Sequence, residues 1–257
     1  MSRNLLVALT GLALSASVAS AQWSDGFESY TAGSNLHGQG GWKGFDNDSA
    51  HAGTASSLFA HSGTRSAAIT TTAPGTYMDD LTHEYSGYTS GAWNYTAWQY
   101  IPSNTPQGTT RNTYFILMNT YADGASGTTD RWSLQLNFNL DTGSTHPNTV
   151  FDDTLAAAGS PGTAFVPLVK DAWVPISVSI DLGANTMVAQ YNGTTVINTS
   201  WTRGTAGANL AIAAVDLYAN GTGPVFYDDL SLSAVPAPAS IALLGLGGLA
   251  AARRRRA

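Results

Sequence analysis

The sequence has no cysteine, so no disulfide bond can hold the folded chain together. Charged residues are also scarce, at 11% of the 257 residues. The first apolar run, residues 5–16, is shorter than the roughly 20 residues that cross a bilayer, which argues against a permanent membrane helix there. A chain of this length can bury a core of adequate size, so these absences indicate a fold held together by its hydrophobic core.

Basic residues are few in the body of the chain. All 17 acidic residues lie between Asp25 and Asp229, whereas only six of the eleven basic residues do. With six basic residues against 17 acidic ones, the body carries a net charge of −11. Such a body repels phosphate backbones, which argues against nucleic-acid binding, and it attracts divalent cations.

The N-terminus has the three parts of a secretory signal peptide, residues 1–21. Arg3 supplies the charge, residues 5–16 supply the apolar region, and Ala19 and Ala21 are the small residues of an A-x-A cleavage site. We therefore expect export across the inner membrane and cleavage after Ala21, so that the mature chain begins at Gln22.

The C-terminus carries a second three-part pattern, residues 235–257. A short proline motif is followed by an apolar stretch over 241–252 and by four arginines, and the motif residues are Val235, Pro236, Ala237, Pro238, Ala239 and Ser240. The arginines resist entering hydrocarbon and stay on the cytoplasmic side. This pattern resembles the PEP-CTERM sorting signal of Gram-negative bacteria, with Ala237 where that family most often has Glu.

This resemblance implies processing by an exosortase-type membrane peptidase, usually in organisms that make extracellular polysaccharide. It places the protein at the cell surface or in the extracellular matrix of a Gram-negative bacterium, in contact with the membrane only through the tail before processing. An ordinary C-terminal anchor is the alternative.

Alternation of apolar and polar residues dominates the body, residues 22–234, and helical periodicity is nearly absent. The alternation predicts strands at 131–140, 174–182 and 226–232, and Asn192-Gly193 predicts a hairpin turn. Further strands are expected at 66–72, 92–101, 112–121, 163–169 and 209–219. We predict one domain, an all-β antiparallel two-sheet jelly-roll sandwich, flanked by an N-terminal signal helix and a short C-terminal hydrophobic helix.

Several short motifs of the body occur in an order typical of one superfamily. They are Asp25-Gly26-Phe27-Glu28, Gly41-Trp42, Ala60-His61-Ser62-Gly63-Thr64, Trp173, Tyr191-Asn192-Gly193 and Tyr227-Asp228-Asp229-Leu230. Together they resemble the concanavalin A-like lectin/glucanase superfamily, and the first and last are similar to MAM-type jelly rolls. The resemblance implies the fold more than a function, because this fold is shared by lectins, hydrolases, lyases and adhesion modules.

The pattern of carboxylates argues against catalysis. Glycoside hydrolysis needs two carboxyl groups a few ångströms apart, and glucanases of this superfamily supply them as Glu-x-Asp-x-x-Glu. Only Glu28 and Glu84 are glutamates, and neither lies in that pattern. Adjacent aspartates such as 79–80, 152–153 and 228–229 point to opposite faces of a strand. The Gln-x-His and Tyr-Phe-Lys motifs of polysaccharide lyases are absent too, so we predict that the protein is not an enzyme.

Calcium is the ligand with some support. Alternation places Asp228 on one face with Phe226, Leu230 and Leu232, which predicts an inward carboxylate that needs a partner. In MAM-like jelly rolls the first and last strands are neighbours, so the resemblance implies Glu28 and Asp228 as ligands of a structural calcium ion. The alternative is that Asp228 accepts backbone hydrogen bonds at a strand edge.

Aromatic residues, with seven tryptophans and eleven tyrosines, also suit carbohydrate binding. Core packing explains most of them, but Trp42 and Trp93 follow glycine-containing turns and are expected to be exposed. Our interpretation is a non-catalytic, carbohydrate-associated surface or matrix protein whose partners are the exosortase and extracellular polysaccharide. The alternatives are a glycan-active enzyme of the same fold and a protein-binding adhesion module.

Overall fold

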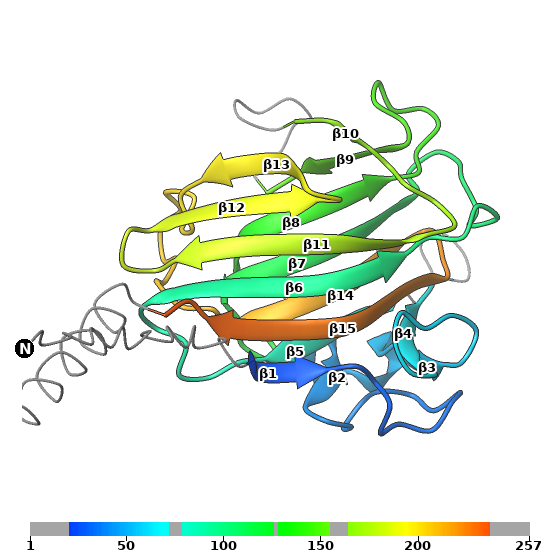
Figure 1. Cartoon of the computed structure of the whole chain (residues 1–257), viewed down its shortest axis with the longest axis horizontal. Coiled ribbons are helices and arrows are strands. Elements are labelled where there is room, and N and C mark those ends of the chain that lie inside the picture. The colour runs from blue at the N-terminus through cyan, green and yellow to red at the C-terminus, as the bar shows by residue number, and fades with distance from the viewer. Residues whose placement is uncertain (1–20, 72–78, 126–127, 155–163, 237–257) are drawn as a thin grey trace, which may run out of the picture.

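The protein is a sandwich of two antiparallel β-sheets (Figure 1). The computed structural model describes residues 21–71, 79–125, 128–154 and 164–236. The two helices expected at the ends of the chain lie outside these residues. Within them, no helix is long and apolar enough to cross a membrane. The predicted all-β, two-sheet architecture is confirmed.

The sheet nearer the viewer in Figure 1, the front sheet, has eight strands in the order β13-β12-β11-β6-β15-β4-β3, with β1 also paired to β15. The strands are β1 (Ala21–Asp25), β3 (Thr54–Ser56), β4 (Ser66–Ile69), β6 (Ala92–Tyr100), β11 (Trp173–Asp181), β12 (Thr186–Tyr191), β13 (Thr194–Thr199) and β15 (Val225–Ala234).

The back sheet has seven strands in the order β10-β9-β8-β7-β14-β5-β2. The strands are β2 (Trp42–Gly44), β5 (Asp80–Glu84), β7 (Asn112–Thr120), β8 (Arg131–Asn139), β9 (Thr149–Asp152), β10 (Val166–Pro167) and β14 (Ala214–Asn220). Two short 3₁₀ helices, η1 (Phe45–Asn47) and η2 (Ser49–His51), follow β2.

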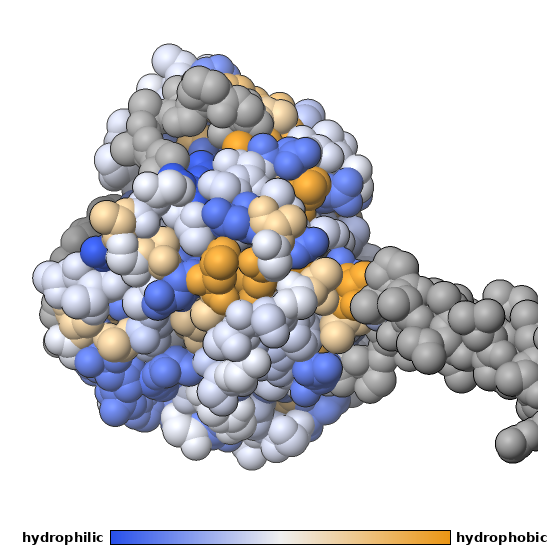
Figure 2. Space-filling model, turned by 90° about the vertical axis from the view of Figure 1, so that its left-hand side faces the viewer, coloured by the Kyte–Doolittle hydropathy of each residue, from blue (hydrophilic) through white to orange (hydrophobic). Residues whose placement is uncertain are grey.

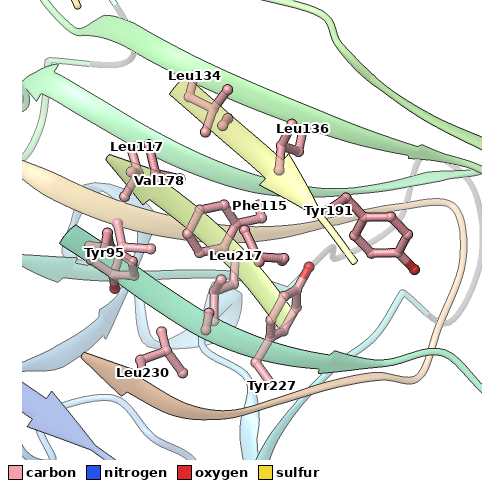
Figure 3. Close-up of a cluster of buried hydrophobic side chains, with 14 of the residues drawn as sticks. Tyr95, Phe115, Leu117, Leu134, Leu136, Val178, Tyr191, Leu217, Tyr227 and Leu230 are labelled. Atoms are coloured by element: carbon pink, nitrogen blue, oxygen red, sulfur yellow. The ribbon is translucent and has the colours of Figure 1, made fainter. Parts of the chain in front are cut away.

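One core fills the space between the sheets because each long strand alternates its side chains. Figure 3 shows Tyr95 and Tyr227 of the front sheet pointing toward Phe115 and Leu217 of the back sheet. All four side chains are fully buried. The buried phenol of Tyr227 accepts a hydrogen bond from Gln99 Nε2 at 2.8 Å, so it costs little to enclose. Burying each such large side chain stabilises the fold by about 1.5–3 kcal/mol.

The hairpin predicted at Asn192-Gly193 joins β12 to β13. Both residues have positive φ, 50° and 73°, as a two-residue turn between antiparallel strands requires. The predicted strands with clear alternation are β8, β11 and β15, within one or two residues of the expected ends. The predictions at 163–169 and 209–219 are too long, since only β10 and β14 form there.

Candidate functional site

The residue predicted to bind calcium from the last strand, Asp228, lies at a bulge in β15. The register with β6 shifts after Asp228, and Asp229 has a φ of 46°. Before the bulge, Phe226 faces outward and its ring contacts Phe59 at 5.0 Å, whereas Leu230 beyond the bulge packs in the core. The prediction that Asp228 shares an inward face with Leu230 is therefore wrong, because the bulge reverses the alternation.

Asp228 is fully buried nonetheless, because the loop of residues 57–65 covers it. Its Oδ2 accepts hydrogen bonds from the backbone N–H groups of His61 at 2.7 Å and Ser62 at 3.2 Å, and its Oδ1 accepts one from Asp229 at 2.7 Å. Burial raises the pKa of Asp228 to about 6, against the effect of these bonds. These contacts match the alternative of a carboxylate bonded to backbone amides.

Glu28, the second predicted calcium ligand, binds the same loop. Its carboxylate accepts hydrogen bonds from the backbone N–H groups of Thr64 at 2.7 Å and Arg65 at 2.6 Å. The bond from Thr64 is the main cause that lowers the pKa of Glu28. Among the residues that the structure describes, no group of three or more His, Cys, Asp or Glu side chains is placed to hold a metal ion. Calcium binding by Glu28 and Asp228 thus stays a prediction.

The two tryptophans expected to be exposed are buried. Trp42 is 0% exposed, and its Nε1 donates to Asp25 Oδ2 at 2.8 Å. Trp93 is 8% exposed, and its Nε1 donates to the carbonyl of Ser90 at 2.8 Å. The prediction of exposure is wrong because both residues occupy inward positions of strands, β2 and β6. Neither ring offers a free face to a sugar.

A different set of side chains crosses the outer face of the back sheet. We call it the acid–tyrosine row, and it consists of Asp153, Asn137, Tyr114, Tyr218 and Asp80. Asn137 pairs with Tyr114, Tyr114 with Tyr218, and Tyr218 with Asp80 in the strand registers, while Asp153 follows β9. The row spans β9, β8, β7, β14 and β5, which is about 19 Å at the usual strand spacing. Four of its members are half-buried, and Asn137 is buried.

Hydrogen bonds fix one end of the row. Asn137 Nδ2 donates to Tyr114 Oη and to Asp153 Oδ2, both at 3.0 Å. The rings of Tyr114 and Tyr218 stack with centroids 5.7 Å apart and planes at 25°. Burial raises the pKa of Tyr114, and raises that of Tyr218 to about 12, so both phenols keep their protons at neutral pH. They remain hydrogen-bond donors and acceptors.

The other end of the row holds a pair of carboxyl groups. Asp80 on β5 interacts with Asp216 on the neighbouring β14, and Asp216 is 3% exposed. Burial raises the pKa of both groups, and the charge of Asp80 raises that of Asp216 further. Burial beside a second carboxyl group therefore favours the protonated form of Asp216.

Aromatic side chains also lie on this outer face, beside the acid–tyrosine row. Phe45, Tyr121 and Trp132 pack over the buried Ile116 and Met118 of β7. A hollow of about 400 Å³ opens beyond the Asp153 end, where its lining includes Trp132, Thr154, Thr205 and Ala206. The face thus combines rings, hydroxyls and carboxyl groups with a recess.

Sequence patterns did not reveal this row. Its members alternate with core residues, and such positions are typical of an ordinary solvent-facing strand surface. Asp80 and Asp216 are far apart in the sequence, and the sequence pattern compares only carboxylates that are neighbours in one strand. A sequence signal for the row is the size of the side chains at outward strand positions. Tyr114, Asn137 and Tyr218 lie where small polar residues are usual.

Comparison with known proteins supports both parts of the sequence interpretation. Residues 234–256 match the PEP-CTERM protein-sorting motif, so the chain carries this signal. No curated protein sequence matches the chain significantly.

The body resembles solved structures of lectin and glucanase type. An endo-1,3-beta-glucanase from Streptomyces sioyaensis is similar with a TM-score of 0.55 and 12% identity, covering 88% of this chain and 100% of that one. The cellulose induced protein Cip1 has a TM-score of 0.53 and 16% identity, over 84% and 99%. The carbohydrate recognition domain of Emp47p has a TM-score of 0.50 and 12% identity, over 86% and 99%. At these identities the likeness shows the fold alone.

Proposed function

We propose that this chain, a PEP-CTERM-sorted protein with a lectin/glucanase-like jelly-roll body, binds neutral polysaccharide at the cell surface through the outer face of the back sheet. The sorting motif indicates export and surface sorting in a Gram-negative bacterium. The acid–tyrosine row carries the rest of the proposal. It is long enough to contact several units of an extended chain, which suits a polysaccharide better than a monosaccharide.

The chemistry of the row fits sugar hydroxyl groups. Asp153 and Asp80 accept hydrogen bonds from hydroxyls, the two phenols donate and accept them, and the tyrosine rings offer apolar contact to sugar C–H groups. The acidic residues of the row and the net charge of −11 repel uronate or sulfate groups. A neutral glycan is therefore favoured over an acidic one.

A glycan array on the purified fragment 22–235 tests this proposal. We expect binding to neutral polysaccharides and at least a tenfold loss with Tyr218→Ala, whose matched control is Ser177→Ala on the outer face of the front sheet. Binding confined to acidic glycans, or equal binding by both variants, would contradict the proposal.

A glycan-active enzyme is the second candidate, and the Asp80–Asp216 pair favours it. Glycoside cleavage uses two carboxyl groups, one of them as an acid, and burial raises the pKa of both members of this pair. The two groups are in contact, however, whereas glycosidases hold theirs about 5–9 Å apart to flank the scissile bond. The shared fold decides nothing here, because it includes a glucanase and a carbohydrate recognition domain. Reducing-end release from a neutral glycan that is lost in Asp216→Asn would establish the enzyme.

The adhesion alternative receives less support. A protein-binding surface of this kind needs a sizeable apolar patch. Among the described residues, the large hydrophobic side chains that are exposed are Leu58, Leu210 and Val235, which belong to three different segments. Figure 2 shows mostly polar surface with small hydrophobic areas on the end of the sandwich that lies to the left in Figure 1.

A further inference from the structure

The sorting motif begins where the sandwich ends. The match starts at residue 234, the last residue of β15, and the N–H of Val235 still donates to the carbonyl of Ala92 at 2.8 Å. Residues 236–240 separate Val235 from the apolar stretch that starts at Ile241. Even fully extended, five residues span at most about 18 Å. A membrane peptidase that handles this segment must therefore come close to the end of the sandwich.

The predicted signal peptide leaves from the same end. β1 pairs antiparallel with β15, and Ala21 lies opposite Ser233. The predicted cleavage site after Ala21 is therefore next to the start of the sorting motif. Figure 1 shows that β1 begins and β15 ends toward the left-hand side of the sandwich. Segments directed to the membrane thus leave from one edge, which makes this the membrane-facing end of the precursor.

A hollow of about 320 Å³ lies at this end, on the outer face of the front sheet. Val188 and Val235 are its outward apolar side chains, and Asp181 adds a carboxylate, whereas Trp93 and Ile180, which also border it, belong to the core. Val235 is 41% exposed although it is a large hydrophobic residue. Figure 2 looks onto this end and shows one of its hydrophobic areas at the right-hand edge of the body, the side of the front sheet.

We propose that this hollow is the docking surface for the peptidase that removes the sorting tail. The short reach between Val235 and the apolar stretch brings that enzyme to the hollow, and the partly exposed Val188 and Asp181 supply contacts that the motif alone does not. The chemistry predicts an apolar side chain of the peptidase in the hollow with a basic side chain beside it, opposite Asp181. Recognition would then depend on the folded body as well as on the tail.

Two pairs of variants test the proposal in the full-length precursor, in a host that processes the wild type. Ser179→Arg and Val188→Arg place a large cation in the hollow, from positions that are opposite each other on β11 and β12. The matched controls Ser177→Arg and Gln190→Arg introduce the same residue at the next pair of positions on the same face, two residues along β11 and β12. Intact mass spectrometry measures the fraction of molecules that keep residues 253–256.

We expect processing to fall at least fivefold in the hollow variants and to stay at the wild-type rate in the controls. Ser179 is exposed, so its variant decides the question if Val188→Arg fails to fold, as a melt of the 22–235 fragment would show. Wild-type processing of Ser179→Arg would overturn the proposal.

Discussion

The outer faces of the two sheets differ in what their strands present. The front sheet carries small hydroxyl side chains along β6 and β15, such as Thr96 and Ser231, whose oxygens bond to each other at 2.7 Å. The back sheet carries the acid–tyrosine row over five strands at comparable positions. Both faces follow the same alternation, so the fold alone does not require tyrosines or paired carboxyl groups. The difference points to the back sheet as the functional face.

The front sheet has aromatic residues as well, but a loop covers them. His61 of the 57–65 loop stacks on Trp98 with ring centroids 3.8 Å apart and planes at 15°, and its Nδ1 lies 2.6 Å from Asp229 Oδ2. Trp173 meets the same His61 edge-on at 5.8 Å. Trp98 and Trp173 therefore hold a loop, whereas Tyr114 and Tyr218 stack on each other and contact no covering loop in the ring contacts described. Variants of the two faces should separate stability from binding.

The largest loss of stability should come from Trp98→Ala on the front face. The variant removes the ring on which His61 stacks, and we expect the free energy of unfolding to fall by about 2–3 kcal/mol, because Trp98 is only half-buried. A thermal melt should show a drop of several degrees. Glycan binding should be unchanged at a temperature where the variant is folded. A loss of binding there would show that the front face also contributes to the glycan site.

A smaller loss should follow Asp228→Ala. The variant leaves the backbone N–H groups of His61 and Ser62 without their buried acceptor, at a cost of about 1–3 kcal/mol. Urea unfolding in chelator and in millimolar calcium separates the two roles of Asp228. An equal loss in both supports hydrogen bonding, and a loss confined to calcium supports the predicted metal site with Glu28.

Stability should rise as the pH falls from 8 toward 5. Folding raises the pKa of Asp79 to about 7 and of Asp228 to about 6, and raises those of Asp80 and Asp216. The folded state therefore binds protons that the unfolded state binds only near pH 4, and this stabilisation is lost as the pH rises through 6 to 7. Melting at a series of pH values should show a maximum on the acid side, flattened in Asp216→Asn. A maximum above pH 7 would contradict the raised values.

The smallest effect should come from Thr96→Ala, on the front face. Its hydroxyl bonds only to Ser231 among the contacts described, so we expect a change within about 0.5 kcal/mol and unaltered glycan binding. A chemical-denaturation curve and the array measure both. A loss of glycan binding in Thr96→Ala would indicate that the glycan binds to the front sheet, contrary to the proposal.

The long strands could be predicted from the sequence because each shows alternation over many residues, as in β8 and β11. The short strands β1, β2, β3, β5 and β9 were not predicted, since three to five residues carry too little pattern. The predicted inward direction of Asp228 was wrong because one bulge in β15 reverses the alternation of side chains. The row was not predicted because its members, such as Tyr218 and Asp80, meet only through strand pairing, and the pattern within one strand does not show which strands are neighbours.

The most direct test of the account is a calorimetric titration of one neutral polysaccharide from the array against three proteins. These are the wild-type 22–235 fragment, the double variant Tyr114→Ala/Tyr218→Ala, and Trp98→Ala. We expect the double variant to bind at least tenfold more weakly, a change of about 1.4 kcal/mol, and Trp98→Ala to bind as the wild type does. Loss of binding in Trp98→Ala with full binding in the double variant would contradict the assignment of the glycan face to the back sheet.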